Sequence, residues 1–222
     1  MNDTSFDDFQ KLIEATTTKA AIEEWRDSGN NQKYPLYNYR NDHVHEVVDL
    51  ARHIASFVNA DMEVVTLAAW FHDSAKPGIG GLSAKNHGET SAGIAEHHLA
   101  ASGIDPITIA RVAEVIKKHV GLTLKKPLEP IEAQVLWEAD KILKLGLIGV
   151  LHYILNGIRI TPGMSLPVIS ERIREFLPLA KRIADSMVTD RGKAIAQERL
   201  RTLQDFSKTL ELELNLGIDT RR

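Results

Sequence analysis

The chain has 222 residues, of which 43% are hydrophobic and 26% are charged, a composition ordinary for a globular protein with a substantial core. Its formal net charge of −3 gives no bulk electrostatic attraction to nucleic acid. The sequence contains no cysteine, which excludes disulfides, thiolate zinc sites and a cysteine nucleophile.

The first residues and the most apolar part of the sequence bear on the localisation of the protein. The first residues, MNDTSFDDFQ, are acidic early and lack the apolar run of a secretory signal. The longest apolar region, LGLIGVLHYILNGI, is interrupted by Gly, His and Asn and is shorter than a membrane span. These features predict a cytoplasmic protein that does not associate with a membrane.

Apolar residues recur at spacings of three and four through most of the chain, whereas the alternation typical of strands is almost absent. We therefore expect an all-α protein. The stretch GIRITPGMSLP is predicted to be a connector or a lid-like loop. In chain order, the predicted helices are a stripe from Val44 to Val58 capped by Asn41 or Asp42, a helix at about 62–71, a helix from HGETS to Gly103, a helix with Asp105 as N-cap and Pro106 at its start, a helix in IEAQVLWEADKILKLG, and helices in VISERIREFLPLAKRIADSM and DRGKAIAQERLRTLQDFSKTLELEL.

Polar residues with metal-binding chemistry fall at inward positions of these helices. Eight of the nine histidines lie between residues 43 and 119. Histidine is the commonest metal ligand, and carboxylates complete sites for Mn, Fe, Co or Zn. His119 follows Ile116 by three positions and Val112 by seven, and Asp140 follows Leu136 by four, so both face the predicted core.

A pair of polar residues, His72 and Asp73, ends the apolar stretch at 62–71. A buried carboxylate is costly unless it is paired or bound to a metal. A single inward histidine is more often a satisfied core residue, and an inward aspartate usually caps a helix or pairs with a cation. Several such groups on consecutive helices need one another, or a cation, to offset their desolvation. The set comprises His43, His72, Asp73, His87, His119 and Asp140.

The stretches DHVHEVVDLA, LAAWFHDSAKP, HGETSAGIA, VIKKHV and WEADKILKLGLIGV, in this order, closely resemble the HD-domain metal-dependent phosphohydrolases. The core signature of that superfamily is a His, a His-Asp doublet and a distant Asp. Here these fall on His43, His72–Asp73 and Asp140. The resemblance implies an HD-domain helical bundle. We expect a single all-α domain over 1–222, with the HD metal-binding core at 38–156 and helical extensions at 1–37 and 157–222 that pack on the core.

Some members of the superfamily hold a second metal with two further histidines, and His87 and His119 stand at the corresponding places. The resemblance thus implies one or two divalent ions per chain (Mn, Fe, Co, Ni, Mg or Zn), with Asp73 as the bridge between two. Relatives with one metal can keep such histidines to contact phosphate. The resemblance also makes Asp73 and Lys76 the candidate catalytic residues. Lys76 is placed to contact a phosphate oxygen, and a solvated surface lysine is the equal alternative.

The implied function is metal-dependent hydrolysis of a phosphate ester, as a phosphomonoesterase or phosphodiesterase. The expected substrate is a small phosphorylated metabolite, with a nucleotide favoured, and not a nucleic acid polymer. The sequence has no Gly-Tyr-Pro tripeptide, which disfavours the cyclic-dinucleotide phosphodiesterases, and no Glu-Asp pair soon after the doublet, which disfavours the alarmone hydrolases. Two alternatives stay open: a non-catalytic metal- or nucleotide-binding sensor, and a diiron oxygenase on the same scaffold. The terminal helices are compatible with a homodimer.

Overall fold

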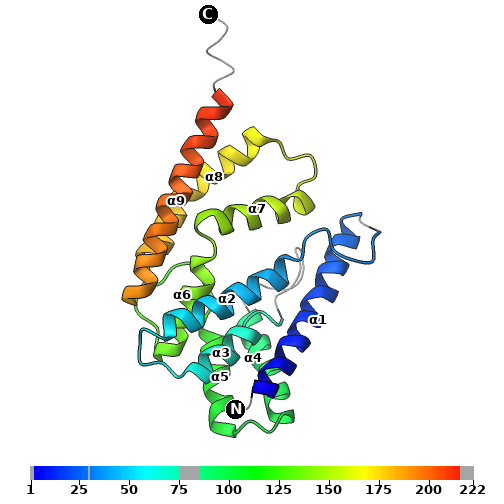
Figure 1. The fold of residues 1–222 in the computed structure, drawn as a ribbon, viewed down its shortest axis with the longest axis vertical. Helices are drawn as coiled ribbons and strands as arrows, with labels where there is room; N and C mark the ends of the chain where they lie inside the picture. Colours follow the sequence, from blue (N-terminus) through cyan, green and yellow to red (C-terminus); the bar gives the residue numbers. More distant parts are fainter. Residues whose placement is uncertain (1–2, 30, 76–85, 216–222) are drawn as a thin grey trace, which may run out of the picture. The chain divides into compact units, whose positions relative to one another are not determined.

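The computed structural model describes residues 3–29, 31–75 and 86–215. Within these ranges every regular element is a helix and no strand occurs, which confirms the predicted all-α class (Figure 1). The helices are α1 (Asp3–Asp27), α2 (Tyr39–Ala55), α3 (Met62–Phe71), α4 (His87–Ala101), α5 (Pro106–Lys118), α6 (Ile131–Ile142), α7 (Gly146–Ile160), α8 (Leu166–Asp185) and α9 (Asp190–Asn215).

The chain divides into two compact units, Met1–Asp140 and Lys141–Arg222, and the boundary falls inside α6. In the first unit α4 packs on α5, and α3 packs on α2, α4 and α5. In the second unit α9 packs on both α7 and α8. All six predicted ligand residues belong to the first unit.

Helix α3 is the central element of the first unit because nearly its whole surface is buried. Every residue from Val64 to Phe71 is buried, and no charged residue follows Glu63 within the helix. A helix that is apolar on all faces can be stable only inside a core. The C-terminal end of α3 therefore lies in the interior of the unit, and His72 and Asp73 follow it there.

Asp61 fixes the start of α3 and connects it to two other helices. Its Oδ1 accepts the backbone N–H groups of Glu63 at 3.1 Å and Val64 at 3.3 Å. Its Oδ2 pairs with Arg111 of α5 at 2.6 Å, and its backbone N–H donates to Glu132 of α6 at 2.8 Å. Burial acts to raise the pKa of Asp61, but the hydrogen bonds from Arg111 and the backbone outweigh it and hold this pKa below 3.8.

We expect Asp61→Ala to lower the free energy of unfolding by about 1–2 kcal/mol, because α3 loses its cap and Arg111 loses one of its two carboxylate partners. Asp61→Asn keeps the capping oxygen and removes only the charge, so its loss should be smaller. The pKa of Asp61 is lower in the folded protein than in the unfolded chain. Its charge therefore stabilises the folded state above pH 3.8, and this stabilisation is lost as the pH falls through and below that value. Urea unfolding of the three proteins at neutral and acid pH measures this. Equal stability of Asp61→Ala and the wild type at neutral pH would contradict the role.

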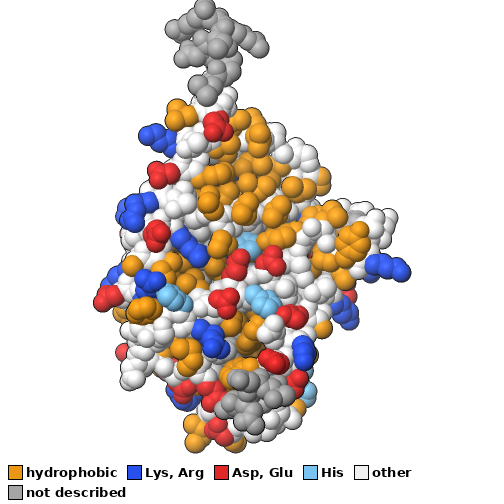
Figure 2. All heavy atoms as spheres, viewed as in Figure 1, with side chains coloured by type: hydrophobic (Ala, Val, Ile, Leu, Met, Phe, Trp, Pro, Cys, Tyr) orange, Lys and Arg blue, Asp and Glu red, His pale blue; other side chains and the backbone are white. Residues whose placement is uncertain are grey.

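Helix α7 of the second unit has one face on α9 and another that the unit leaves uncovered. Leu147, Leu151, Leu155 and Ile158, one stripe of the helix, are each between 39% and 55% exposed. Figure 2 shows hydrophobic side chains gathered on this unit. Among the described residues, no single helix has both the length and the apolar composition of a membrane span, although α6 and α7 together, as a bent pair, meet the two criteria.

The loop after α7 is shorter than the predicted connector GIRITPGMSLP. The helix continues through Ile160, and α8 begins at Leu166. The glycine expected to open the loop, Gly157, is a buried helical residue instead.

Candidate metal centre

The structure brings the six predicted ligand residues together inside the first unit. Most of them stand at helix ends, where the backbone changes direction and a side chain can point along the helix axis into a shared space. His43 lies near the start of α2, His72 and Asp73 follow α3, His87 begins α4, His119 follows α5, and Asp140 lies in the last turn of α6.

Asp73 occupies the centre of this cluster. Its Oδ2 lies 3.7 Å from Nε2 of His43 and 3.5 Å from Nε2 of His72. Its Oδ1 lies 3.6 Å from Nε2 of His87 and 3.5 Å from Nε2 of His119. Each carboxylate oxygen thus faces its own pair of imidazoles, which is the arrangement expected of a carboxylate that bridges two ions.

Asp140 belongs to one half of the cluster. Its Oδ1 lies 3.3 Å from Nε2 of His43, and both side chains are almost fully buried. We call His43, His72, Asp140 and Oδ2 of Asp73 the inner half, and His87, His119 and Oδ1 of Asp73 the outer half. In each half, one carboxylate oxygen of Asp73 and two histidines offer donor atoms within 4.8 Å of one another, a spacing that one metal ion can span.

Two of the imidazoles are held by backbone carbonyls of the preceding helical turn. Nδ1 of His72 lies 2.7 Å from the carbonyl oxygen of Ala69, and Nδ1 of His119 lies 2.6 Å from that of Ile116. A carbonyl oxygen can only accept, so Nδ1 must donate in both rings. The lone pair of each neutral ring is then on Nε2, the atom that faces Asp73, as in histidines that bind metals.

The environment keeps His72 neutral and leaves one of its atoms in need of a cation. Burial lowers the pKa of His72 to about 3, although the charge of Asp73 opposes the shift. Its fully buried Nε2 makes no hydrogen bond within the described part of the chain. This lone pair faces a carboxylate oxygen of Asp73 at 3.5 Å, and two such acceptors repel each other unless a hydrogen-bond donor or a cation lies between them. The residues therefore fit a divalent metal, of the kinds that prefer imidazole and carboxylate ligands.

A residue that the sequence interpretation missed holds the backbone just after the doublet. Ser91 of α4 is buried, and its hydroxyl oxygen accepts the backbone N–H of Ala75 at 3.1 Å. The hydroxyl of Ser74 donates to the carbonyl of Phe71 at 2.8 Å and turns the chain at the end of α3. The only sequence signal for Ser91 was its place in the HGETSA stretch, which also contains His87. Lys76, the predicted phosphate contact, lies outside the described residues.

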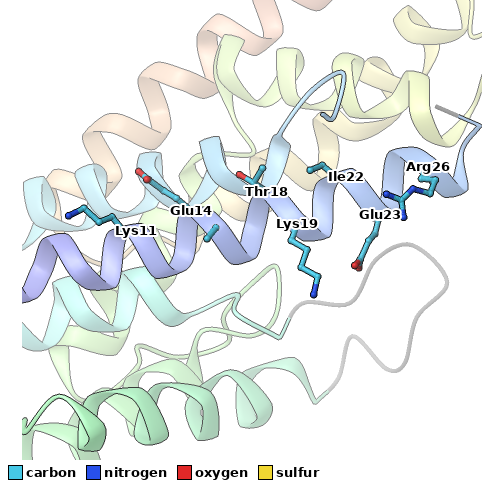
Figure 3. Close-up of a pocket in the computed structure, with 8 residues that line it drawn as sticks. Lys11, Glu14, Thr18, Lys19, Ile22, Glu23 and Arg26 are labelled. Atoms are coloured by element: carbon cyan, nitrogen blue, oxygen red, sulfur yellow. The ribbon is translucent and has the colours of Figure 1, made fainter. Parts of the chain in front are cut away.

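A hollow of about 710 Å³ lies elsewhere on the first unit, along α1 (Figure 3). Its described lining carries charges of both signs: the cations of Lys11, Lys19 and Arg26 and the carboxylates of Glu14 and Glu23. None of the six ligand residues is among those lining residues.

The HD domain family matches residues 40–145, a span that contains all six clustered residues. This segment of the chain is an HD domain. HD domains typically bind divalent metal ions, and the cluster in this HD domain can hold one.

Solved structures share the fold over nearly the whole chain. The structure of Bacillus subtilis YpgQ in complex with ADP is 20% identical, with a TM-score of 0.63, and the match covers 94% of this chain and 97% of YpgQ. A Lactobacillus plantarum protein is 17% identical, with a TM-score of 0.65 and coverages of 97% and 99%. An HD-superfamily hydrolase from Bacillus thuringiensis is 18% identical, with a TM-score of 0.60 and coverages of 93% and 98%. No curated protein matches the chain. The HD domain here thus has the fold of HD-superfamily hydrolases.

Proposed function

We propose that this protein is a metal-dependent phosphohydrolase that cleaves a phosphate ester of a small metabolite, and that its substrate is a nucleotide. The observation that carries the proposal is the position of Asp73, with one carboxylate oxygen toward each pair of histidines. The structure of YpgQ, which has the same fold, contains ADP, and this supports a nucleotide as the substrate class.

The proposed division of work follows from the two halves of the cluster. His43, His72 and Asp140 would hold one ion, His87 and His119 a second, and Asp73 both. A bound divalent ion acidifies a coordinated water toward neutral pH and screens the charge of a phosphoryl group. The chain's own contribution is to present neutral imidazoles in fixed orientations, so that little reorganisation is needed during the reaction.

The charge of the cluster favours an anionic substrate. An imidazole that binds a metal is a neutral ligand, so with metal bound Asp73 and Asp140 would carry the only negative charges among the six residues. Two divalent ions would outweigh two carboxylates and leave the site positive. In a buried site this field is screened less than at the surface. Lys76, three positions after Asp73 in the sequence, remains the predicted contact of the phosphate and would add to it.

Phosphate release after chelation and metal return tests this proposal. We expect protein treated with a chelator to be inactive on a panel of nucleoside mono-, di-, tri- and cyclic phosphates and on an aryl phosphate. Activity should return with Mn²⁺, Co²⁺, Ni²⁺ or Fe²⁺ on at least one nucleotide, because the chemistry needs a bound ion. Nucleotide binding without turnover by the loaded protein would indicate a sensor. Oxygen consumption together with a mixed-valent iron signal would indicate an oxygenase, and either result would overturn the proposal.

A further inference from the structure

The outer half of the cluster is made where the start of α4 meets the end of α5. Nε2 of His87, the first residue of α4, lies 3.1 Å from Nε2 of His119, the residue after α5, and the ring centroids are 4.9 Å apart. The two helices pack along each other in the first unit. The spacing of these two imidazoles therefore depends on how closely the two helix ends approach.

Gly88, the second residue of α4, is buried at this point of approach. A Cβ atom placed on it would lie 2.8 Å from Cγ2 of Val120, 3.3 Å from the carbonyl oxygen of Lys117 and 3.4 Å from that of Ile116. The first contact is closer than real Cβ atoms allow. The other two involve backbone of the last turn of α5, which cannot rotate away as a side chain can.

One of these carbonyls also holds a ligand. The Ile116 oxygen accepts the Nδ1–H of His119 at 2.6 Å, and so fixes which nitrogen of that ring faces Asp73. A Cβ atom on Gly88 would make an ordinary contact with this oxygen and a tight one with the carbonyl oxygen of Lys117, so a displacement of the last turn of α5 would carry the ring of His119 with it. Gly88 therefore affects the position of both histidines of the outer half. It is the chain neighbour of His87, and it contacts the last turn of α5, which His119 follows.

The requirement at Gly88 is for space and not for an unusual backbone conformation. The residue lies within α4, where alanine is intrinsically favoured over glycine by about 1 kcal/mol. Gly93, in the same helix, has open space where a Cβ would be, with no atom within 4 Å. The two glycines thus differ in their surroundings, and Gly93 is a matched control.

We propose that Gly88 is a positioning residue that sets the approach of α4 to α5 and so creates the outer half of the metal centre. This inference rests on the proposed two-ion function. Gly88→Ala should push the helix ends apart by a few tenths of an ångström and separate His87 from His119. The inner half, made by residues of α2 and α6 and by the two residues that follow α3, should keep its ion.

Calorimetric titration of Mn²⁺ into chelator-treated protein tests this directly, because it counts ions without measuring catalysis. We expect two ions per chain for the wild type, Gly93→Ala and Val120→Ala. Gly88→Ala should keep one ion at wild-type affinity and bind the other about tenfold more weakly or not at all. Adding Val120→Ala to Gly88→Ala removes the shortest contact and should recover part of the lost affinity, because only the two carbonyl contacts then remain.

The controls separate failure of this inference from failure of the proposed function. Fewer than two ions in the wild type would overturn the two-ion function on which the inference rests. Two ions in Gly88→Ala at wild-type affinities would overturn the inference alone, and so would loss of both ions from a variant with unchanged circular dichroism. Should Gly88→Ala fail to fold, the double variant is compared with Val120→Ala. Equal affinity of those two for the second ion would then overturn the inference.

Discussion

Asp73→Asn should lower kcat for phosphate release by about a thousandfold or more, because the several kcal/mol of stabilisation that the ions give the transition state is lost. The substitution hardly changes the shape of the side chain. It does, however, replace one of the two oxygens that face the histidine pairs by an NH₂ group, which cannot accept a metal. The variant should therefore bind fewer ions than the wild type. Steady-state kinetics in excess Mn²⁺ and metal analysis after gel filtration measure both effects.

The matched control for this variant is Asp49→Asn. Asp49 is exposed on α2, the helix that also carries His43, and it takes no part in the cluster. We expect this control to keep full activity and metal content. Asp73→Asn with a kcat within tenfold of the control would contradict a catalytic role for the bridging carboxylate.

Asp140→Asn should lower kcat by about a hundredfold and reduce the metal content from two ions to one, because it removes a charged ligand of the inner half alone. Oδ1 of Asp140 lies 3.3 Å from His43, while Oδ1 of Asp73 with His87 and His119 is untouched by the change. Kinetics and Mn²⁺ titration measure the result, with Asp49→Asn again as the control.

This variant and Gly88→Ala remove opposite halves of the centre. Their comparison shows which ion the reaction depends on, and we expect both to be impaired because both halves share Asp73. Two ions at wild-type affinities and an unchanged kcat in Asp140→Asn would contradict the assignment of Asp140 as a ligand.

The sequence predicted helices best where a local signal marks their ends. The structure begins α5 at Pro106 with Asp105 as N-cap, as predicted, because the Asp-Pro pair leaves few alternatives. The cap of α2 was predicted at Asn41 or Asp42 but lies at Asn38, whose side chain accepts the backbone N–H of Asn41 at 3.2 Å. Several residues able to cap stand close together there, and local sequence does not choose among them.

For the candidate site, too, the sequence predicted the features that depend on nearby residues and not those that depend on the packing of distant ones. Inward spacing predicted His119 and Asp140, and the position after an apolar helix predicted His72 and Asp73. His43 and His87 were predicted from their places at the starts of helices and from the family resemblance. Which histidines face which oxygen of Asp73 depends on the packing of separate helices, and no spacing along the chain encodes it. Gly88 carries no side-chain chemistry, so only the distances to α5 reveal its place in the site.

X-ray diffraction at the manganese absorption edge, from crystals grown with Mn²⁺, is the most direct measurement of the central claim. The account predicts two anomalous peaks that share Asp73, one beside His43, His72 and Asp140 and one beside His87 and His119. No peak at Asp73, or peaks only at other positions of the chain, would contradict it.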